Sequence, residues 1–262
     1  MNPLKALWAA GEPALGGWAA LGSPLAAEML ARAGFDYVCI DNQHGVNDYL
    51  GTVGLLQAID CGDSTPLVRV PWNEPGIIGK MLDAGADGVI IPMVNSVAEA
   101  EAAVAACRYA PAGARSYGPV RASLRDPDYY VTANDHVACI PMIETVAALA
   151  ALDDILAVPG IDAVYVGPAD LSVSLGLPPG NNDDAPAFVD ALETIVAACE
   201  RHGVVPGIHA TTALTERRLE MGFRMVTVTA DNVAMRDGLQ AATAVGRNGR
   251  TAGRSGDGGS MY

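Results

Sequence analysis

Short, continuously apolar runs alternate with longer segments of helical periodicity along most of the chain. The apolar runs do not alternate polar with apolar residues, which is typical of parallel strands covered on both faces. We predict eight strands, at residues 15–20, 36–40, 66–70, 88–92, 138–143, 162–166, 204–208 and 224–228. We also predict eight helices, at residues 24–33, 47–59, 74–84, 96–109, 145–157, 186–202, 211–221 and 232–245.

Glycine ends several of these helices, in the stretches ARAGFD, LDAGADG, RHGVV and LEMGFR. Repeated β–α units in this number predict a (β/α)8 TIM barrel. A doubly wound open sheet is the alternative, but the Gly-rich turn GxGxxG that would support it does not occur. We therefore predict one barrel domain over residues 1–246 and a disordered, Gly- and Arg-rich tail over residues 247–262. The connection over residues 110–137 exceeds the usual loop length, so it is either functional or contains elements that the pattern does not reveal.

Composition narrows the class of protein. The formal net charge of −14 argues against a nucleic-acid partner, because an acidic surface repels phosphates. There is no apolar run of about 18 residues, which argues against a membrane span. Glu12 and nearby Gly and Pro residues interrupt the N-terminal apolar stretch. A signal peptide needs an unbroken apolar region, so this pattern argues against one. The five cysteines lack CxxC spacing, which indicates reduced thiols in a cytoplasmic protein.

Candidate catalytic residues follow the predicted strands at their carboxyl ends, which form the working face of such a barrel. Glu144 and Asp170 follow neighbouring strands, so their carboxylates can converge, although two carboxylates in a dry pocket repel each other. A cation such as Mg²⁺ or Mn²⁺ removes the repulsion, since it binds carboxylates together with water and substrate oxygens. The alternative is that both acids are helix N-cap or first-turn residues.

Asp41 and His44 lie three residues apart just after the second predicted strand. This spacing lets the carboxylate hold the imidazole in one tautomer, as a general base requires, while a histidine in a surface turn is the alternative. Arg69 lies inside the apolar stretch LVRVPW, where an unpaired guanidinium is costly. We expect a ligand anion or a structural acid to face it. His209 should at most line the rim of the site.

Several stretches carry a family resemblance when read in order: DNQHG, VRVPWNEPGIIGKMLDAGADGVIIPMVNS, RYAPAGARSYGP, MIETVAALAALDDILAVPGIDAVYVGPADLSVSLG and PGI. They resemble the HpcH/HpaI aldolase family of class II, metal-dependent 2-oxo-acid aldolases, from about Gly17 to Gly246. The resemblance implies a barrel of the phosphoenolpyruvate/pyruvate type. It also implies reversible cleavage of 4-hydroxy-2-oxo acids to pyruvate or hydroxypyruvate plus an aldehyde, by way of a metal-stabilised enolate.

The resemblance also implies roles for single residues. Glu144 and Asp170 match the ligands of a divalent metal, which would be Mg²⁺, Mn²⁺ or Co²⁺. His44 with Asp41 matches a base dyad, and Arg69 matches the arginine that holds the 2-oxo group. Asp83 matches an acid that reaches a neighbouring subunit's site, in a hexamer built from three dimers that exchange their last helix. The implied substrate-binding residues are Arg69, Gly167, Pro168, Ala169 and Asp170.

Some positions depart from the family pattern. Met142 stands where many members have Gln, and Gln43 stands where the family has Glu beside the base histidine. GARSYGPVRASL replaces the GxRG of heptanedioate-cleaving members and is closer to hydroxy-ketoacid aldolases and macrophomate synthase, which leaves the aldehyde open. Two alternative functions stay open: an oxaloacetate decarboxylase that transfers an enolate, and a non-catalytic 2-oxo-acid-binding protein.

Overall fold

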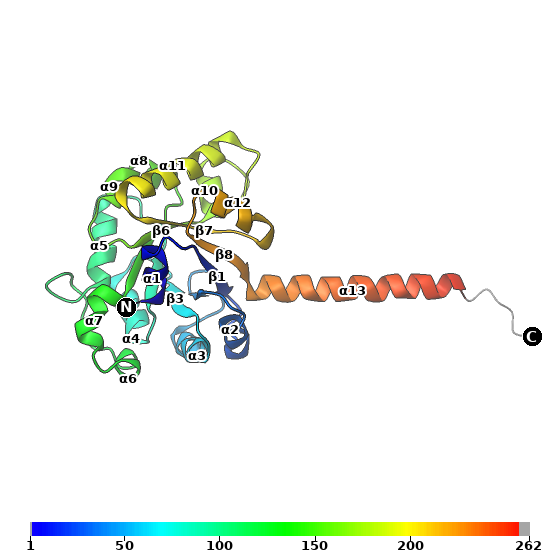
Figure 1. Cartoon of the computed structure of the whole chain (residues 1–262), viewed down its shortest axis with the longest axis horizontal. Helices are drawn as coiled ribbons and strands as arrows, with labels where there is room; N and C mark the ends of the chain where they lie inside the picture. The colour runs from blue at the N-terminus through cyan, green and yellow to red at the C-terminus, as the bar shows by residue number, and fades with distance from the viewer. Residues whose placement is uncertain (1, 257–262) are drawn as a thin grey trace, which may run out of the picture.

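The apolar runs pair side by side as parallel strands around a common axis, with helices outside them (Figure 1). The computed structural model describes residues 2–256, with side chains for residues 2–247. Its strands are β1 (Ala14–Ala19), β2 (Tyr37–Asp41), β3 (Thr65–Arg69), β4 (Gly88–Ile91), β5 (Ala138–Pro141), β6 (Ala163–Val166), β7 (Val205–His209) and β8 (Met225–Ala230). Their order is β5-β4-β3-β2-β1-β8-β7-β6, and a parallel bridge between Met142 and Tyr165 nearly closes the barrel. The predicted (β/α)8 barrel is confirmed.

Polar caps explain where several helices begin. The side chains of Ser23, Asp48, Glu74, Ser96 and Thr145 each accept a hydrogen bond from the first turn of the helix that follows. The helices are α1 (Pro3–Ala9), α2 (Pro24–Ala31), α3 (Tyr49–Ile59), α4 (Pro75–Asp83), α5 (Val97–Cys107), α6 (Ala122–Arg125), α7 (Tyr129–His136), α8 (Val146–Ala150), α9 (Leu152–Leu156), α10 (Pro168–Ser174), α11 (Pro186–His202), α12 (Thr215–Glu220) and α13 (Asp231–Gly256), with the 3₁₀ turn η1 (Thr212–Leu214) before α12.

One predicted helix was wrong in part, the long connection contains elements as one of our two alternatives had it, and two short helices were not predicted. The predicted helix 145–157 is broken at Ala151 into α8 and α9. The connection 110–137 contains α6 and α7, which its weak apolar pattern did not reveal. The short helices α1 and α10 were not predicted, because a single turn or two carries too little periodicity to recognise.

Two apolar layers hold the barrel together. The inner layer fills the barrel with large side chains such as Trp18, Tyr37 and Tyr165, and Leu4 of α1 joins it from the amino-terminal end. Gly16 makes room for this packing, since a Cβ there would lie 2.0 Å from the Tyr37 ring. The outer layer lies between strands and helices and is mostly aliphatic. Burial of both strand faces explains why the strands are continuously apolar.

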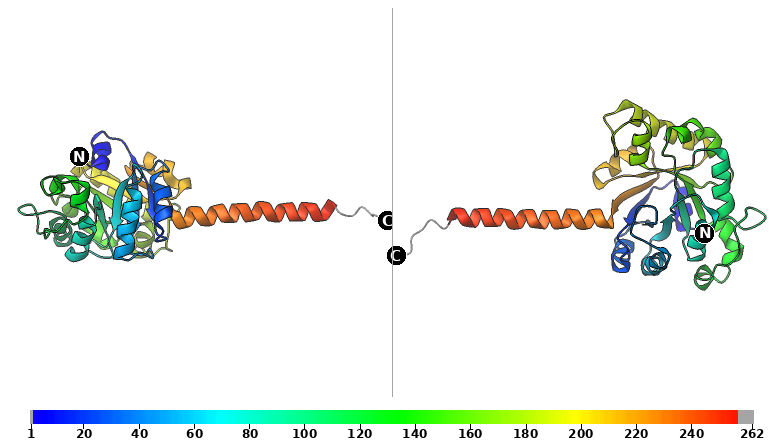
Figure 2. Two further views of the ribbon diagram at one scale, coloured as in Figure 1. Left: turned by 90° about the horizontal axis from the view of Figure 1, so that it is seen from below. Right: turned by 180° about the vertical axis from the view of Figure 1, so that it is seen from behind.

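Helix α13 leaves the barrel and projects beyond it in all three views (Figures 1 and 2). It continues to Gly256, past residue 245 where we expected it to end. The rest of the predicted tail, residues 257–262, lies outside the described residues.

None of the helices within residues 2–256 is both long and apolar enough to span a bilayer.

Candidate active site

A cavity of about 290 Å³ opens at the carboxyl ends of the strands, where the catalytic residues of such barrels lie. Its lining includes predicted site residues: His44, Arg69, Gly167, Pro168, Ala169 and Asp170. A larger hollow of about 860 Å³ lies beside α1 at the opposite end of the barrel, and none of the predicted site residues lines it. The smaller cavity is therefore the candidate active site.

Glu144 brings an unpaired acceptor to this site. Its side chain follows β5, is 1% exposed, and accepts a hydrogen bond through Oε1 from the Met93 backbone N–H at 2.8 Å. Its Oε2 is buried and has no hydrogen-bond partner among the described residues. Gly167 passes so close that a Cβ there would lie 2.5 Å from this oxygen. Burial raises the pKa of Glu144 to about 7, and the nearby charge of Asp170 adds to the rise.

Asp170 lies in the first turn of α10, which begins directly after β6. At β5 the helix cap is Thr145 rather than Glu144, since Thr145 Oγ1 accepts a hydrogen bond from the Ala148 N–H at 3.0 Å. The helix-cap alternative is therefore wrong for Glu144, whereas Asp170 does occupy the first-turn position that the alternative described. Helix capping leaves the buried oxygen of Glu144 unexplained.

The two acids fit a hard divalent cation. A cation beside Glu144 Oε2 would supply the missing partner and offset the repulsion between Glu144 and Asp170. Mg²⁺ commonly binds one or two protein carboxylates and completes its shell with water and substrate oxygens. Nowhere in residues 2–256 do three or more His, Cys, Asp or Glu side chains gather as a metal site. A two-carboxylate site open to substrate is consistent with both observations.

Arg69 faces a structural acid, which is one of the two kinds of partner that we expected for its guanidinium. The strand register places Arg69 opposite Asp41, and the guanidinium forms a bidentate pair with Nε–Oδ1 at 2.9 Å and Nη2–Oδ2 at 2.7 Å. The guanidinium also lies 5.2 Å from the centre of the Trp18 ring. Burial alone would raise the pKa of Asp41, but the hydrogen bonds and charge of Arg69 outweigh it and lower that pKa. Arg69 thus stays charged at the cavity wall.

His44 lines the cavity, but its imidazole is not held by Asp41. The hydrogen bond between these residues runs from the His44 backbone N–H to Asp41 Oδ1 at 3.2 Å, and the Gln43 N–H donates to the same oxygen at 3.1 Å. The Asp41 carboxylate is thus occupied by the backbone and by Arg69. The His44 side chain is exposed, and the described residues offer its imidazole no hydrogen bond. The structure brings this histidine to the site without the side-chain dyad that the spacing suggested.

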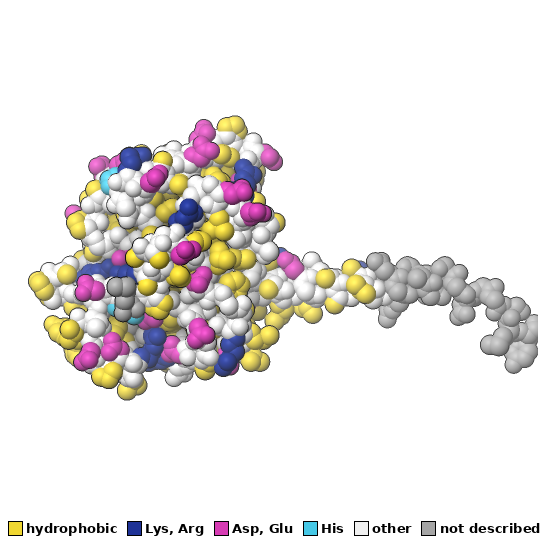
Figure 3. Space-filling model, in the orientation of Figure 1, with side chains coloured by type: hydrophobic (Ala, Val, Ile, Leu, Met, Phe, Trp, Pro, Cys, Tyr) yellow, Lys and Arg dark blue, Asp and Glu magenta, His cyan; other side chains and the backbone are white. Residues whose placement is uncertain are grey.

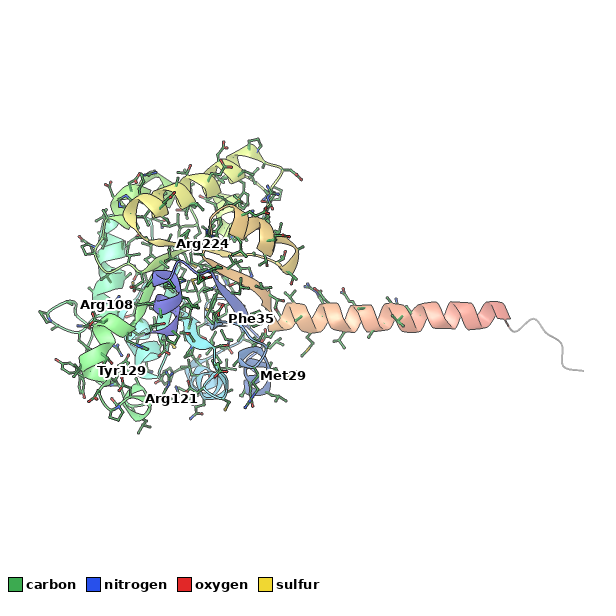
Figure 4. All side chains as sticks on the ribbon, in the orientation of Figure 1. Met29, Phe35, Arg108, Arg121, Tyr129 and Arg224 are labelled. Atoms are coloured by element: carbon green, nitrogen blue, oxygen red, sulfur yellow. The ribbon has the colours of Figure 1, made fainter. Side chains whose placement is uncertain are left out.

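Asp83 lies away from this cavity. It is the last residue of α4, at the amino-terminal end of the barrel, and pairs with Arg115 at 2.7 Å. Arg115 in turn lies against the rings of Tyr109 and Tyr129, on the side of the barrel where Figure 4 labels Tyr129. Within one chain, Asp83 therefore cannot join the residues that line the cavity.

Further residues line the cavity that we did not predict as site residues: Trp18, Met142, Tyr165, Gly180, Asn181 and His209. His209 ends β7 and lines the cavity, where we had expected it at most at the rim. Trp18 and Tyr165 lie inside apolar runs and carry no signal that separates them from core residues. Asn181 is held by the fully buried Arg218, whose Nη2 donates to its Oδ1 at 2.9 Å, a contact across 37 residues that no local pattern contains.

The fold and the site define a (β/α)8-barrel enzyme in which Asp170 and a charged arginine line a small cavity, while Glu144 lies buried behind Gly167 of its wall. The chain belongs to the HpcH/HpaI aldolase/citrate lyase family, whose model matches residues 15–237. The resemblance found in the sequence is confirmed.

Named relatives agree with this assignment. The chain is 42% identical over 248 residues to the 4-hydroxy-2-oxo-heptane-1,7-dioate aldolase of Salmonella dublin, which covers 93% of this chain and 94% of the relative. A solved HpcH/HpaI aldolase/citrate lyase family protein from Burkholderia cenocepacia J2315 superposes with a TM-score of 0.88 at 36% identity, over 94% of this chain and 100% of that one. Macrophomate synthase superposes with a TM-score of 0.85 at 30% identity, over 95% of this chain and 89% of that one. The protein is an aldolase, and hence a carbon–carbon lyase.

Proposed function

We propose that this aldolase requires a divalent metal and reversibly cleaves 4-hydroxy-2-oxo acids to pyruvate or hydroxypyruvate plus an aldehyde. The observation that carries the proposal is the buried Oε2 of Glu144, which has no hydrogen-bond partner among the described residues. The negative charge of Asp170 is close enough to raise the pKa of Glu144. A buried acceptor without a partner is costly, so its retention calls for a ligand. Asp170 and Glu144 would hold Mg²⁺, Mn²⁺ or Co²⁺, which supplies Lewis-acid polarisation of the 2-oxo group when bound.

The remaining chemistry belongs to side chains of the cavity wall. Arg69, kept charged by Asp41, would face the keto oxygen and stabilise negative charge that develops there. The backbone of Gly167, Pro168, Ala169 and Asp170 would hold the substrate carboxylate. An imidazole nitrogen of His44 would take the proton of the 4-hydroxyl group during cleavage.

A Schiff-base mechanism finds no support in the lysines. The chain has two, Lys5 and Lys80. Lys5 pairs with Asp162 at 2.7 Å near the start of β6, and Lys80 lies 4.2 Å from the centre of the Tyr49 ring. Neither lines the cavity. The enolate must therefore be stabilised by charge rather than through an imine.

We also propose that the enzyme assembles as a hexamer, a trimer of dimers that exchange α13. Support comes from the apolar side chains along this projecting helix, where Met235, Leu239 and Val245 are 55%, 63% and 73% exposed. Hydrophobic side chains lie along the described part of α13 and at its base (Figure 3), close to Met29 and Phe35 as labelled in Figure 4. Exposed apolar stripes of this kind are usually covered by a partner. In such an assembly Asp83 would reach a neighbouring cavity.

A cytoplasmic location belongs to the same proposal. All five cysteines are free, and Cys39, Cys107, Cys139 and Cys199 are buried. Thiols that persist unpaired are typical of a reducing compartment.

The function is tested with the metal-stripped protein. Exchange of the C3 protons of pyruvate in D₂O, followed by NMR, should appear on addition of Mn²⁺ and disappear with EDTA. Asp170→Asn should abolish the exchange and its response to Mn²⁺, whereas Asp154→Asn, which changes an exposed acid of α9, should behave as the wild type. Full activity in EDTA would refute the metal assignment.

The substrate class is tested with a panel of 4-hydroxy-2-oxo acids. Release of pyruvate or hydroxypyruvate together with aldehyde supports aldol cleavage. Metal-dependent release of CO₂ from oxaloacetate, without cleavage of any 4-hydroxy-2-oxo acid, would favour the decarboxylase alternative instead.

A further inference from the structure

Met93, shortly after β4, has a strained backbone. Its φ of +57° lies in the left-handed region, and of the residues that the structure describes it is the one non-glycine residue with a positive φ. This conformation is unfavourable for an L-amino acid, because its Cβ comes too close to the following carbonyl oxygen. The Met93 side chain is half-buried and does not line the candidate active site. The reason for the strain therefore lies in the backbone of this residue.

The backbone of Met93 holds the side chain of Glu144. The Met93 N–H donates to Glu144 Oε1 at 2.8 Å, across 51 residues of chain, and the Glu144 side chain is 1% exposed. The second oxygen, Oε2, has no hydrogen-bond partner in the described part of the chain. One backbone donor thus determines which oxygen of this buried carboxylate is occupied and which one is left for a ligand.

The left-handed turn is what directs this N–H at Glu144. Pro92 precedes Met93 and is buried, and its ring fixes its own φ near about −65°, so the chain has little freedom on that side. An ordinary φ of about −60° at Met93 would rotate the preceding peptide by about 120° relative to the residues that follow. Those residues are held in place, since Val94 is 0% exposed and the Asn95 side chain is hydrogen-bonded at both ends. The N–H would therefore turn away from the carboxylate.

Asn95 joins the strained turn to the segment that carries Glu144. Its Nδ2 donates to the Met93 carbonyl oxygen at 2.8 Å, and its Oδ1 accepts a hydrogen bond from Thr145 Oγ1. The Asn95 backbone N–H donates to Glu99 Oε2 at 2.6 Å. Because Thr145 directly follows Glu144, this one amide side chain fixes the hydrogen-bond donor and the carboxylate relative to each other.

We propose that Met93 is a positioning residue for the metal: its left-handed backbone holds Glu144 Oε1 and so keeps Oε2 free and oriented for a divalent cation. This rests on the proposed function, in which Glu144 and Asp170 hold that cation. Backbone strain persists where the surrounding structure imposes it, as Asn95 does here, and such strain concentrates at functional sites. Loss of a group that orients a metal ligand typically weakens metal binding about 10- to 100-fold.

The test separates the backbone of Met93 from its side chain. Mn²⁺ binding to the metal-stripped, full-length protein is measured by titration calorimetry, with free Mn²⁺ followed by EPR. Met93→Val keeps an apolar side chain but is β-branched and disfavours a positive φ, so the affinity should fall about 10-fold or more. Met93→Gly removes the side chain but adopts a positive φ freely, so it should restore the affinity to within about 3-fold of the wild type. Met29→Val, the same substitution at an exposed position of α2, should bind Mn²⁺ as the wild type does.

The hydrogen bonds of Asn95 provide a second comparison. Asn95→Leu has a similar size but cannot bind the Met93 carbonyl or the Thr145 hydroxyl, so it should also weaken Mn²⁺ binding. Added to Met93→Val, it should have little further effect, because both substitutions act through the same N–H.

Equal losses of affinity in folded Met93→Val and Met93→Gly would assign the effect to the side chain and overturn the inference. Wild-type affinity in Met93→Val would overturn it as well. If Met93→Val does not fold, Met93→Ala takes its place in the comparison with Met93→Gly, since alanine also disfavours a positive φ. Absence of Mn²⁺ binding in the wild type would instead refute the proposed function, and the inference would fall with it.

Discussion

Acid should destabilise this protein partly through His209, and replacing that residue should remove this part of the sensitivity. The groups that face the imidazole are the Tyr165 hydroxyl from β6, the Trp18 ring from β1, and the charges of Arg69 and Asp41 from β3 and β2. Burial and Arg69 oppose a charged imidazole, whereas Asp41 favours it. The first two dominate, so the pKa of His209 is lowered to about 4 from its ordinary 6.5.

The sign and size of the effect follow from this difference in pKa. Between about pH 6.5 and pH 4 the unfolded chain binds a proton at this histidine that the folded chain does not bind. The free energy of unfolding therefore falls as the pH falls through this range. One pKa unit corresponds to about 1.4 kcal/mol, so the loss due to His209 reaches about 3 kcal/mol near pH 4.

The assay is urea denaturation in EDTA at one protein concentration, at several values between about pH 7.5 and pH 4.5. Other titrating groups affect all variants alike, so the informative quantity is the acid-induced loss in the wild type minus that in His209→Leu. This difference should be about 2 to 3 kcal/mol at the lowest pH. His202→Leu is the matched control, because it also replaces a histidine by leucine but at the surface, and its loss should match the wild type within about 0.5 kcal/mol. Equal acid-induced losses in wild type and His209→Leu would refute the reasoning about a buried, neutral imidazole.

Further predictions concern the packing of the site and the barrel. Asp41→Asn should destabilise the protein by about 3 to 5 kcal/mol in urea denaturation, because it leaves the guanidinium of Arg69 without its charge partner. Adding Arg69→Met should restore part of this loss. Strictly additive losses of the two substitutions would contradict a buried pair. Gly167→Ala should weaken Mn²⁺ binding at least about 10-fold in titration calorimetry, because the new Cβ would lie 2.5 Å from Glu144 Oε2 and displace that side chain. Gly16→Ala should lower stability by about 1 to 3 kcal/mol or more, since its Cβ would overlap the Tyr37 ring, whereas Gly79→Ala, with open space around its Cβ in α4, should be neutral or stabilising.

Much of the architecture can be predicted from the chain because it depends on local pattern. Strands buried on both faces must be continuously apolar, and helices of three turns or more show their period, so the barrel order follows from reading the runs in sequence. The strand-end rule then places Glu144 and Asp170 on one face of the molecule. The family could be recognised for the same reason, since its motifs lie at those strand ends. Short elements such as α10 and α7 escaped prediction because one or two turns carry little periodicity.

The sequence by itself thus determined the barrel, the family, and some of the residues at the carboxyl ends of the strands, among them Arg69, Glu144 and Asp170. Only the tertiary structure decided which side chains those residues contact. Asp41 pairs with Arg69 across 28 residues instead of holding the His44 imidazole, because the β2–β3 register places the two side chains opposite each other. Tyr37 reaches Thr227 across 190 residues because β8 and β2 both flank β1 in the barrel. The buried oxygen of Glu144 and the orientation of His209 likewise depend on neighbours from other strands, and no local pattern encodes a contact that exists only once the barrel has closed.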